Sequence, residues 1–287
     1  MDEPISRHFV SRGLRLHYTD WGNAQAPPLI LVHGGRDHSR NWDDVARRLR
    51  HRWHIIAPDL RGHGDSAWSP DGDYAIYAFI YDLGQLIDTH KFDAVTLVGH
   101  SLGGNIVLNY TALYPETVRK AVAIEGLGIS PRLAAERDAI PFADHVRRWM
   151  DELRAADGKT HKRYTSIDEA AKRMVATNPR LTPDLARHLT LHGLRKHDDG
   201  TYSWKFDNAL RIRLATDLTT QQQRELWARV RCPTLLVYGA DSWASNPATD
   251  GRAAQFPNAK VSLYPGAGHW VQHDQLEPFV AELEQFL

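Results

Sequence analysis

The sequence predicts an α/β fold in which helices cover both faces of a mostly parallel β-sheet, with a mainly helical segment inserted into it. Short apolar runs typical of buried strands alternate with stretches of helical periodicity, as in successive βαβ units. A glycine-rich turn joins one of these runs directly to a helix. Strand-like runs then nearly vanish in the middle of the chain, where charged helical stretches dominate.

The composition is that of an ordinary globular protein. The 287 residues are 42% hydrophobic and 24% charged, which suits one large domain with an insertion. The formal net charge is +0, so nothing points to a nucleic-acid partner. A single cysteine, Cys232, excludes an internal disulfide framework and agrees with a reducing compartment. The first residues lack a signal-peptide pattern and no apolar run suits a membrane span, so we expect a cytoplasmic monomer or homodimer.

The first part of the core, residues 1–128, begins at an edge of the sheet. Residues 7–21 alternate between apolar and polar side chains around Gly13, which predicts an antiparallel hairpin. Residues 29–32 and 54–57 are continuous apolar runs and predict buried strands. Between these runs, apolar residues recur at helical spacing and predict a helix: Trp42, Val45, Ala46 and Leu49.

The chain then continues with two helices and two strands. Helical patterns cover residues 77–90 and 102–113, and Pro115 ends the second of them. Apolar runs at 95–98 and 121–124 predict two more strands of the parallel sheet.

A sharp turn, Gly99-His100-Ser101-Leu102-Gly103, joins the strand at 95–98 to its helix. A serine at such a turn takes a strained backbone conformation, so its hydroxyl projects above the edge of the sheet. Gly99 and Gly103 are needed because a Cβ would collide with the neighbouring strand and helix. The helix N-terminus beneath the serine can bind an oxyanion. Ser101 is therefore the predicted nucleophile.

Residues 129–230 predict a helical cap or lid. Lys and Arg number 20 against 14 Asp and Glu in residues 131–231, which leaves 15 (35 − 20) against 21 (35 − 14) elsewhere. A solvated basic surface accounts for this charge, and a preference for anionic substrates is the alternative. Aromatic residues alternate with polar ones after the turn at Gly200 and predict a small irregular or hairpin element: Tyr202, Trp204 and Phe206.

The second part of the core, residues 231–287, resumes the parallel pattern. Apolar runs at 235–238 and 261–264 predict strands, and residues 276–287 have the periodicity of a final helix.

A serine hydroxyl needs a base to remove its proton, and only imidazole titrates near neutral pH. Of the 16 histidines, His269 follows the strand at 261–264 in a glycine-rich loop. The C-terminal ends of parallel strands share one edge of a sheet, which places this loop on the side of Ser101. His269 is the predicted base, with His273 as the substitute.

The base in turn needs a carboxylate to orient it. Asp241 comes shortly after the strand at 235–238 and is the preferred acid. Glu125 directly follows the strand at 121–124 and is the alternative acid. Asp241 could also be a simple turn-forming residue beside Ser242.

These features together resemble the α/β-hydrolase superfamily. The resemblance rests on the order and spacing of four segments besides the acid: His33-Gly34-Gly35, the turn Asp59-Leu60-Arg61-Gly62-His63-Gly64-Asp65-Ser66, the Gly-x-Ser-x-Gly turn, and the loop Gly266-Ala267-Gly268-His269-Trp270. It implies an α/β-hydrolase fold with a mostly parallel sheet of eight strands, helices on both faces and the cap over residues 129–230.

The resemblance also implies an oxyanion hole and a position for the acid. Backbone N–H groups of Leu102 and Gly35 would bind the oxyanion, with Arg36 as the alternative to Gly35. The family acid usually stands three residues after the glycine of its strand, where this chain has Ser242. Some members take their acid from the earlier strand, which keeps Glu125 open.

The expected activity is that of a serine hydrolase without a cofactor. It would cleave a carboxylic ester, thioester or lactone of a small, partly apolar molecule through an acyl-enzyme. The alternatives are a hydrolase of carbon–carbon bonds in vinylogous diketones, a cofactor-free perhydrolase, and a ligand receptor with little turnover. His188 and His192 stand four residues apart on a predicted helix, with His197 nearby. We expect no metal site, because no glutamate lies between them and no cysteine is near.

Overall fold

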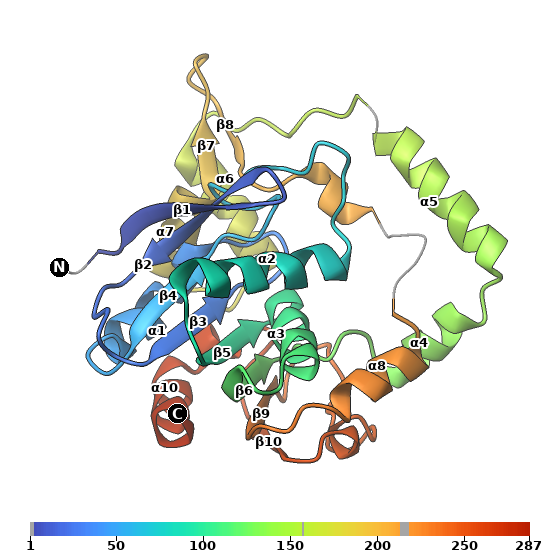
Figure 1. The fold of residues 1–287 in the computed structure, drawn as a ribbon. Helices are drawn as coiled ribbons and strands as arrows, with labels where there is room; N and C mark the ends of the chain where they lie inside the picture. The colour runs from blue at the N-terminus through green and yellow to red at the C-terminus, as the bar shows by residue number, and fades with distance from the viewer. Residues whose placement is uncertain (1–2, 157, 213–217) are drawn as a thin grey trace.

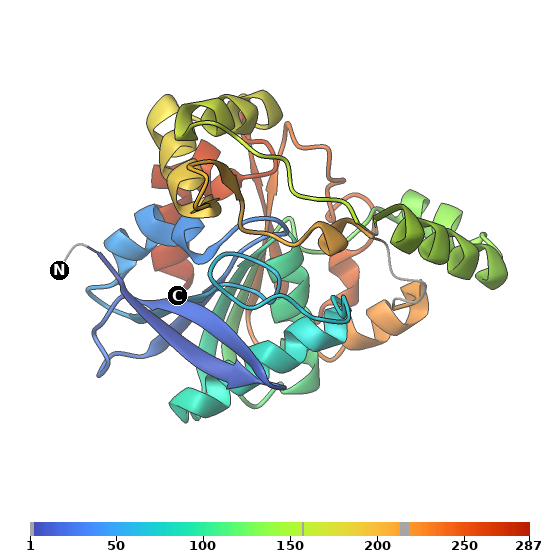
Figure 2. The ribbon, with the colours of Figure 1, turned by 90° about the horizontal axis from the view of Figure 1, so that it is seen from above.

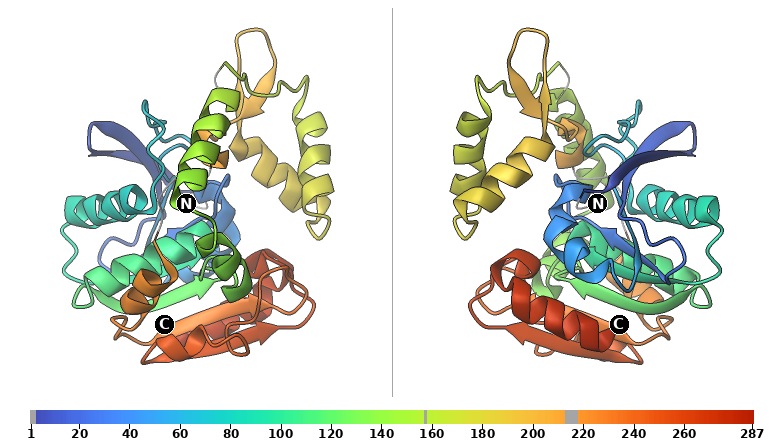
Figure 3. Two further views of the ribbon diagram at one scale, coloured as in Figure 1. Left: turned by 90° about the vertical axis from the view of Figure 1, so that its right-hand side faces the viewer. Right: turned by 90° about the vertical axis from the view of Figure 1, so that its left-hand side faces the viewer.

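The core of the structure is built around a main sheet of eight strands. The computed structural model describes residues 3–156, 158–212 and 218–287. The strands of the main sheet are β1 (Ile5–Ser11), β2 (Leu14–Asp20), β3 (Pro28–Val32), β4 (His54–Pro58), β5 (Val95–His100), β6 (Val118–Ile124), β9 (Thr234–Gly239) and β10 (Ala259–Tyr264). Their order is β1-β2-β4-β3-β5-β6-β9-β10. Strand β2 is antiparallel to β1 and β4, and the other neighbours are parallel. The β1–β2 hairpin and β10 form opposite edges (Figure 3).

Helices cover both faces of this sheet (Figure 1). The helices of the core are η1 (Ser39–Trp42), α1 (Asp43–Leu49), α2 (Ile76–His90), α3 (Leu102–Leu113), η3 (Ala253–Gln255), α9 (Val271–Asp274) and α10 (Leu276–Phe286). Side chains of α2 and α3 pack into one apolar layer, and side chains of α1 and α10 pack into the other.

Strand β3 shows why the strand sequences are apolar throughout. Ile30 and Val32 belong to the layer of α2 and α3, whereas Leu29 and Leu31 belong to the layer of α1 and α10. All four side chains are fully buried. A strand with helices on both faces has no exposed face for polar side chains, so it becomes a continuous apolar run.

Between β6 and β9 the chain forms a mainly helical inserted segment. Its elements are α4 (Pro131–Asp138), α5 (Phe142–Ala156), α6 (Ile167–Thr177), α7 (Pro183–Gly193), β7 (Leu194–Lys196), β8 (Tyr202–Trp204), η2 (Asn208–Arg211) and α8 (Thr220–Trp227). Figure 2 shows α4 and α5 standing apart from α6, α7 and the β7–β8 hairpin. Helix α8 returns to the core, where Trp227 is buried in the layer of α2 and α3.

The turn after β4 is tied to α2 by a buried ion pair. The Arg61 guanidinium donates to both oxygens of Asp82, through Nε at 2.7 Å and through Nη2 at 2.8 Å. Ser11 Oγ of β1 donates to the same carboxylate at 2.5 Å. Arg61 is only 2% exposed. These contacts join three segments at the side of the sheet.

The fold confirms the predicted α/β-hydrolase architecture with its mostly parallel sheet of eight strands. The edge hairpin, the predicted helices of the core and the small hairpin around Gly200 are also present. No helix in the described part of the chain is both long enough and apolar enough to span a bilayer.

Candidate active site

Ser101 stands at the sharp turn between β5 and α3. Its φ of 53° and ψ of −114° are strained for a residue with a Cβ. The Ser101 N–H donates to the carbonyl of Ile124 at 2.8 Å, which anchors the turn to the end of β6. A Cβ on Gly99 would lie 2.3 Å from the carbonyl oxygen of Gly103, and one on Gly103 would lie 2.2 Å from that of Val32. Both glycines are therefore required for the turn.

The loop after β3 runs beside this serine. A Cβ on Gly34 would lie 3.2 Å from Cβ of Ser101. Leu102 is the first residue of α3, so its N–H has no partner inside the helix. Within the described residues, neither Gly35 nor Arg36 uses its backbone N–H in a hydrogen bond. These N–H groups are available to an oxyanion, and both Gly35 and Arg36 remain candidates for the second donor.

His269 lies in the loop between β10 and α9, next to the serine turn. Nε2 of His100 donates to the carbonyl of His269 at 2.9 Å, and the two rings are 4.7 Å apart. His100 immediately precedes Ser101, so this contact joins the histidine loop to the nucleophile turn. Nδ1 of His269 lies 2.5 Å from Oε2 of Glu125.

Glu125 directly follows β6 and its carboxylate is held from several sides. Its backbone has a φ of 50°, and its N–H donates to Val237 at 2.9 Å. The N–H of Gly239 donates to Oε1 at 2.9 Å, and Oγ of Ser242 donates to Oε2 at 2.6 Å. The Glu125 side chain is fully buried. These donors leave the carboxylate one orientation, in which it faces His269.

Asp241, the preferred acid in the sequence analysis, is not beside His269. Its carboxylate accepts from Nη2 of Arg180 at 2.8 Å, and both side chains of this pair are nearly half exposed. Of the two candidate acids, the structure therefore places Glu125 in contact with His269, whereas Asp241 contacts Arg180. Ending a strand at the right edge brings a residue near the site, but the direction of its side chain depends on the local turn.

Two residues near the histidine were not predicted from the sequence to belong to the site. Ser242 occupies the usual position of the family acid, and its hydroxyl holds Glu125 instead. The Trp243 ring lies 4.8 Å from that of His269 and is 75% exposed. The sequence does contain an indication for Ser242. With a serine at the position of the family acid, the carboxylate that orients the histidine must come from elsewhere in the chain.

A cavity of about 410 Å³ opens beside Ser101. Glu125 and the helices α3, α4 and α8 contribute to its wall. The polar and charged lining residues, besides Ser101 and Glu125, are Tyr74, Asn105, Arg137, Thr220, Gln223, Arg224 and Arg252, and two tryptophans, Trp227 and Trp243, also line the cavity. The remaining lining is largely apolar, as is typical of a small-molecule site.

Arg252 fixes one wall of this cavity. It is 6% exposed, and Nη2 donates to the carbonyl of Ser245 at 2.7 Å. Nε donates to Asp250, and Nη1 donates to the carbonyl of Leu127 at 3.4 Å. One side chain thus joins the loop after β9 to the start of the inserted segment.

Several histidines near the site are buried and held neutral. Burial lowers the pKa of His63 to about 3 and that of His38 to about 4. Burial also lowers the pKa of His33 and His100. All four residues are at most 6% exposed.

Because these histidines stay neutral in the folded protein, we expect its free energy of unfolding to decrease as the pH falls from about 6.5 toward 4. Below pH 6.5 the unfolded chain protonates its histidines while the folded chain does not, which costs about 1.4 kcal/mol per pH unit for each one. Asp37 opposes this trend, because burial raises its pKa to about 8 and rising pH then favours its ionised, unfolded form. Since His38 and His63 outnumber this single carboxyl, the urea midpoint should fall with acid. The midpoint of His63→Asn should depend less on pH, and a wild-type midpoint that rises toward pH 5 would contradict the prediction.

Two further histidine features lie outside the serine site. His273, the substitute base, stands on α9 with its Nε2 buried and without a hydrogen-bond partner among the described residues. His188 and His192 do lie on one helix, α7, and the fold brings Asp43 to them. Asp43 could not be predicted as their neighbour from the sequence, because it lies in a distant part of the chain.

Comparisons with known proteins show the family of this chain. A sequence model described as the alpha/beta hydrolase fold matches residues 27–276. Esterase YbfF from Escherichia coli is 29% identical over 91% of this chain and 92% of its own length. A 2-hydroxy-6-oxo-2,4-heptadienoate hydrolase from Pseudomonas putida is 26% identical over 99% of this chain and 96% of its own. The solved thioesterase domain from the curacin biosynthetic pathway shares the fold, with a TM-score of 0.84 at 20% identity over 98% and 99% of the two chains. With this match over most of its length and its serine at the strand-to-helix turn, the protein belongs to the alpha/beta hydrolase family.

Proposed function

We propose that this protein is a serine hydrolase that cleaves a carboxylic ester, thioester or lactone through an acyl-enzyme. Ser101 is the nucleophile, His269 the general base, and Glu125 the carboxylate that orients the imidazole. The observation that carries this proposal is the contact of Nδ1 of His269 with the buried Glu125 carboxylate, at the sheet edge where Ser101 stands.

In the first half of the reaction, Oγ of Ser101 attacks the substrate carbonyl carbon while its proton passes to Nε2 of His269. The carbonyl oxygen becomes an oxyanion and accepts hydrogen bonds from the N–H groups of Leu102 and of Gly35 or Arg36. Each such donor contributes about 2.7–4 kcal/mol in comparable enzymes. Glu125 stabilises the imidazolium that forms. The intermediate then expels its leaving group, which takes the proton from His269.

In the second half, water replaces the leaving group. His269 removes a proton from this water, which attacks the acyl carbon of the Ser101 ester. The tetrahedral intermediate collapses, the proton returns to Oγ of Ser101, and the free acid leaves. No cofactor takes part in these steps.

The inserted segment acts as the cap of this site in the proposal. Helices α4 and α8 contribute part of the cavity wall, and the apolar lining suits a small or medium, partly apolar acyl group. Similarity to an esterase and to a thioesterase domain agrees with acyl transfer as the reaction class.

Hydrolysis of a carbon–carbon bond is the second candidate function. It is favoured by the similarity to the 2-hydroxy-6-oxo-2,4-heptadienoate hydrolase and by Arg224, which lines the cavity. Among the described residues, no carboxylate pairs with Arg224, so its guanidinium is available to an anionic substrate.

A fluorophosphonate tests the proposed nucleophile directly. Intact mass of the treated wild type should show one adduct per chain, because an activated serine attacks the phosphorus. Ser101→Ala should show none, and His269→Ala should label far more slowly. Hydrolysis of p-nitrophenyl esters and of a ring-fission dienone then separates the two candidate reactions. An unlabelled but folded wild type would contradict an assembled triad and favour a binding protein.

A further inference from the structure

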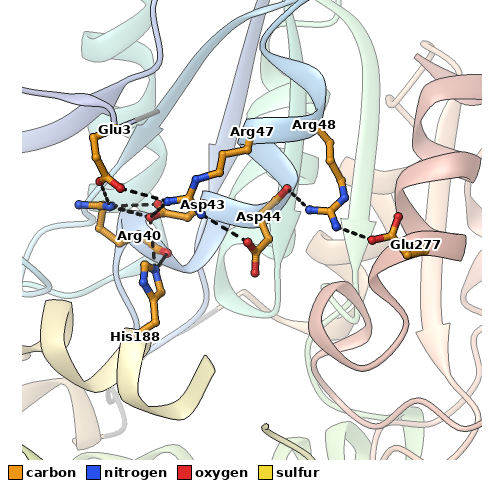
Figure 4. A network of polar contacts seen from close by, with 8 residues as sticks. All are labelled: Glu3, Arg40, Asp43, Asp44, Arg47, Arg48, His188 and Glu277. Carbon is orange, nitrogen blue, oxygen red and sulfur yellow. Dashed lines mark hydrogen bonds and ion pairs between the residues drawn. The ribbon is translucent and has the colours of Figure 1, made fainter. Parts of the chain in front are cut away.

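Three side chains with metal-binding atoms meet where the inserted segment touches the core, outside the serine cavity. His188 and His192 stand one turn apart on α7, with ring centroids 4.7 Å apart. Asp43, the first residue of α1, faces them, and Nε2 of His188 is 3.3 Å from its Oδ2 (Figure 4). We propose that Asp43, His188 and His192 bind a divalent transition-metal ion such as Zn²⁺, which ties α7 to α1.

The ligand set and its spacing suit such an ion. Two imidazoles and one carboxylate, with water completing the shell, are a common set of zinc ligands. One candidate ligand atom from each side chain lies within 4.8 Å of the others. Tetrahedral zinc with bonds of about 2.1 Å holds its ligand atoms about 3.4 Å apart. Small side-chain rotations would therefore close the site without moving the helices.

His192 presents a lone pair that the protein does not use. Burial lowers its pKa to about 4, with further lowering by Arg40 and His188, so the ring is neutral near pH 7. Among the described residues, neither ring nitrogen of His192 has a hydrogen-bond partner. A metal ion would supply that partner.

Nε2 of His188 lies between Asp43 and the carbonyl oxygen of Arg40, where the ion would bind. Its hydrogen bond to Asp43 raises its pKa, and Nε2 also lies 3.1 Å from the carbonyl oxygen of Arg40. The metal would replace the hydrogen between imidazole and carboxylate. Because an imidazole binds a metal ion only through a nitrogen that carries no proton, binding should weaken as the pH falls.

The net charge around the proposed site favours a cation. Arg40 and Arg47 contact Asp43, and both also pair with Glu3. The whole network in Figure 4 contains four carboxylates (Glu3, Asp43, Asp44 and Glu277) against three guanidinium groups (Arg40, Arg47 and Arg48). With His188 neutral, the network carries one net negative charge. Other titratable groups that interact with the histidine pair are His38 and His273 of the core and Lys205 of the inserted segment.

Isothermal titration of metal-free protein with ZnCl₂ at about pH 7.5 tests the site. The wild type should bind one ion per chain, and its Tm should rise with zinc. His192→Gln should bind at least about tenfold more weakly, since loss of a ligand exceeds the usual cost of losing an outer partner. The zinc-free Tm of this variant should stay unchanged, because His192 makes no hydrogen bond among the described residues. Lowering the pH to about 6 should weaken zinc binding to the wild type.

His197→Gln is the matched control, because this histidine belongs to the same inserted segment but bonds to Ser203 instead. It should keep the wild-type zinc affinity. The proposal is overturned if the wild type binds no zinc, or if His192→Gln binds zinc as tightly as the wild type. The cluster would then be an ion pair between α7 and α1 only.

Discussion

Glu125→Gln is expected to lower kcat on a p-nitrophenyl ester by about 10³–10⁴-fold. The amide can still occupy the space beside His269, but it lacks the charge that stabilises the imidazolium. It can also present an N–H to Nδ1, which favours the wrong tautomer of the ring. KM should change much less than kcat, because Glu125 acts on the histidine in the chemical step. Steady-state kinetics and a thermal melt on the same preparation separate lost catalysis from lost folding.

Asp241→Asn is the matched control for this substitution. Asp241 follows the next strand of the sheet and pairs with Arg180 at a site where both side chains are nearly half exposed. Exposed ion pairs contribute about 0–1 kcal/mol, so its stability should hardly change. Its kcat should stay within about twofold of the wild type. A large loss in Asp241→Asn with little loss in Glu125→Gln would reverse the assignment of the acid.

Arg61→Met is expected to destabilise the protein by about 3–5 kcal/mol. Removal of the guanidinium leaves the Asp82 carboxylate buried and without its bidentate partner. The charge must then be hydrated or protonated inside the core, and both cost free energy. Urea unfolding at neutral pH measures the change as a lower midpoint and a lower free energy of unfolding.

A double variant distinguishes the buried charge from simple loss of packing. Arg61→Met combined with Asp82→Leu removes both charges, so much of the lost stability should return. Recovery should be incomplete, because Ser11 loses the acceptor of its hydroxyl. If Arg61→Met costs less than about 1 kcal/mol, Asp82 is hydrated in place and the ion pair does not hold the turn.

The sheet could be predicted from the sequence because buried strands consist of continuous apolar residues. The run at 29–32 is apolar at every position since β3 faces helices on both sides. The positions of Ser101 and His269 followed from a second general rule, that parallel strands end at one edge of the sheet. Both rules depend only on the hydrophobic pattern and the order of the strands, and a single sequence contains both.

The carboxylate could not be chosen by the same rules. Asp241 and Glu125 both follow strands that end at the correct edge, so strand order alone does not separate them. The difference lies in local geometry, because Glu125 has a left-handed backbone and accepts hydrogen bonds from Gly239 and Ser242. The secondary-structure propensities of the residues do not determine the direction in which a side chain points from a turn.

Contacts between distant side chains were also out of reach. Arg61 belongs to a recognisable turn, but the sequence of that turn does not indicate that Arg61 forms an ion pair with Asp82. The spacing of His188 and His192 was visible, whereas Asp43 joins them only after the inserted segment has folded back on the core. Both contacts depend on the tertiary arrangement and leave no local pattern.

In the proposed triad, the carboxylate that orients His269 follows β6, so the loop after β9 does not have to supply it. Family members with the acid in the later loop must keep that loop in place for the chemistry. Here the loop contributes a hydroxyl from Ser242 and an exposed Trp243 over the histidine. The exposed position Trp243 can therefore change while the proton-transfer residues stay fixed. We expect substrate range to evolve most readily at Trp243, which makes this position the natural starting point for a mutant library.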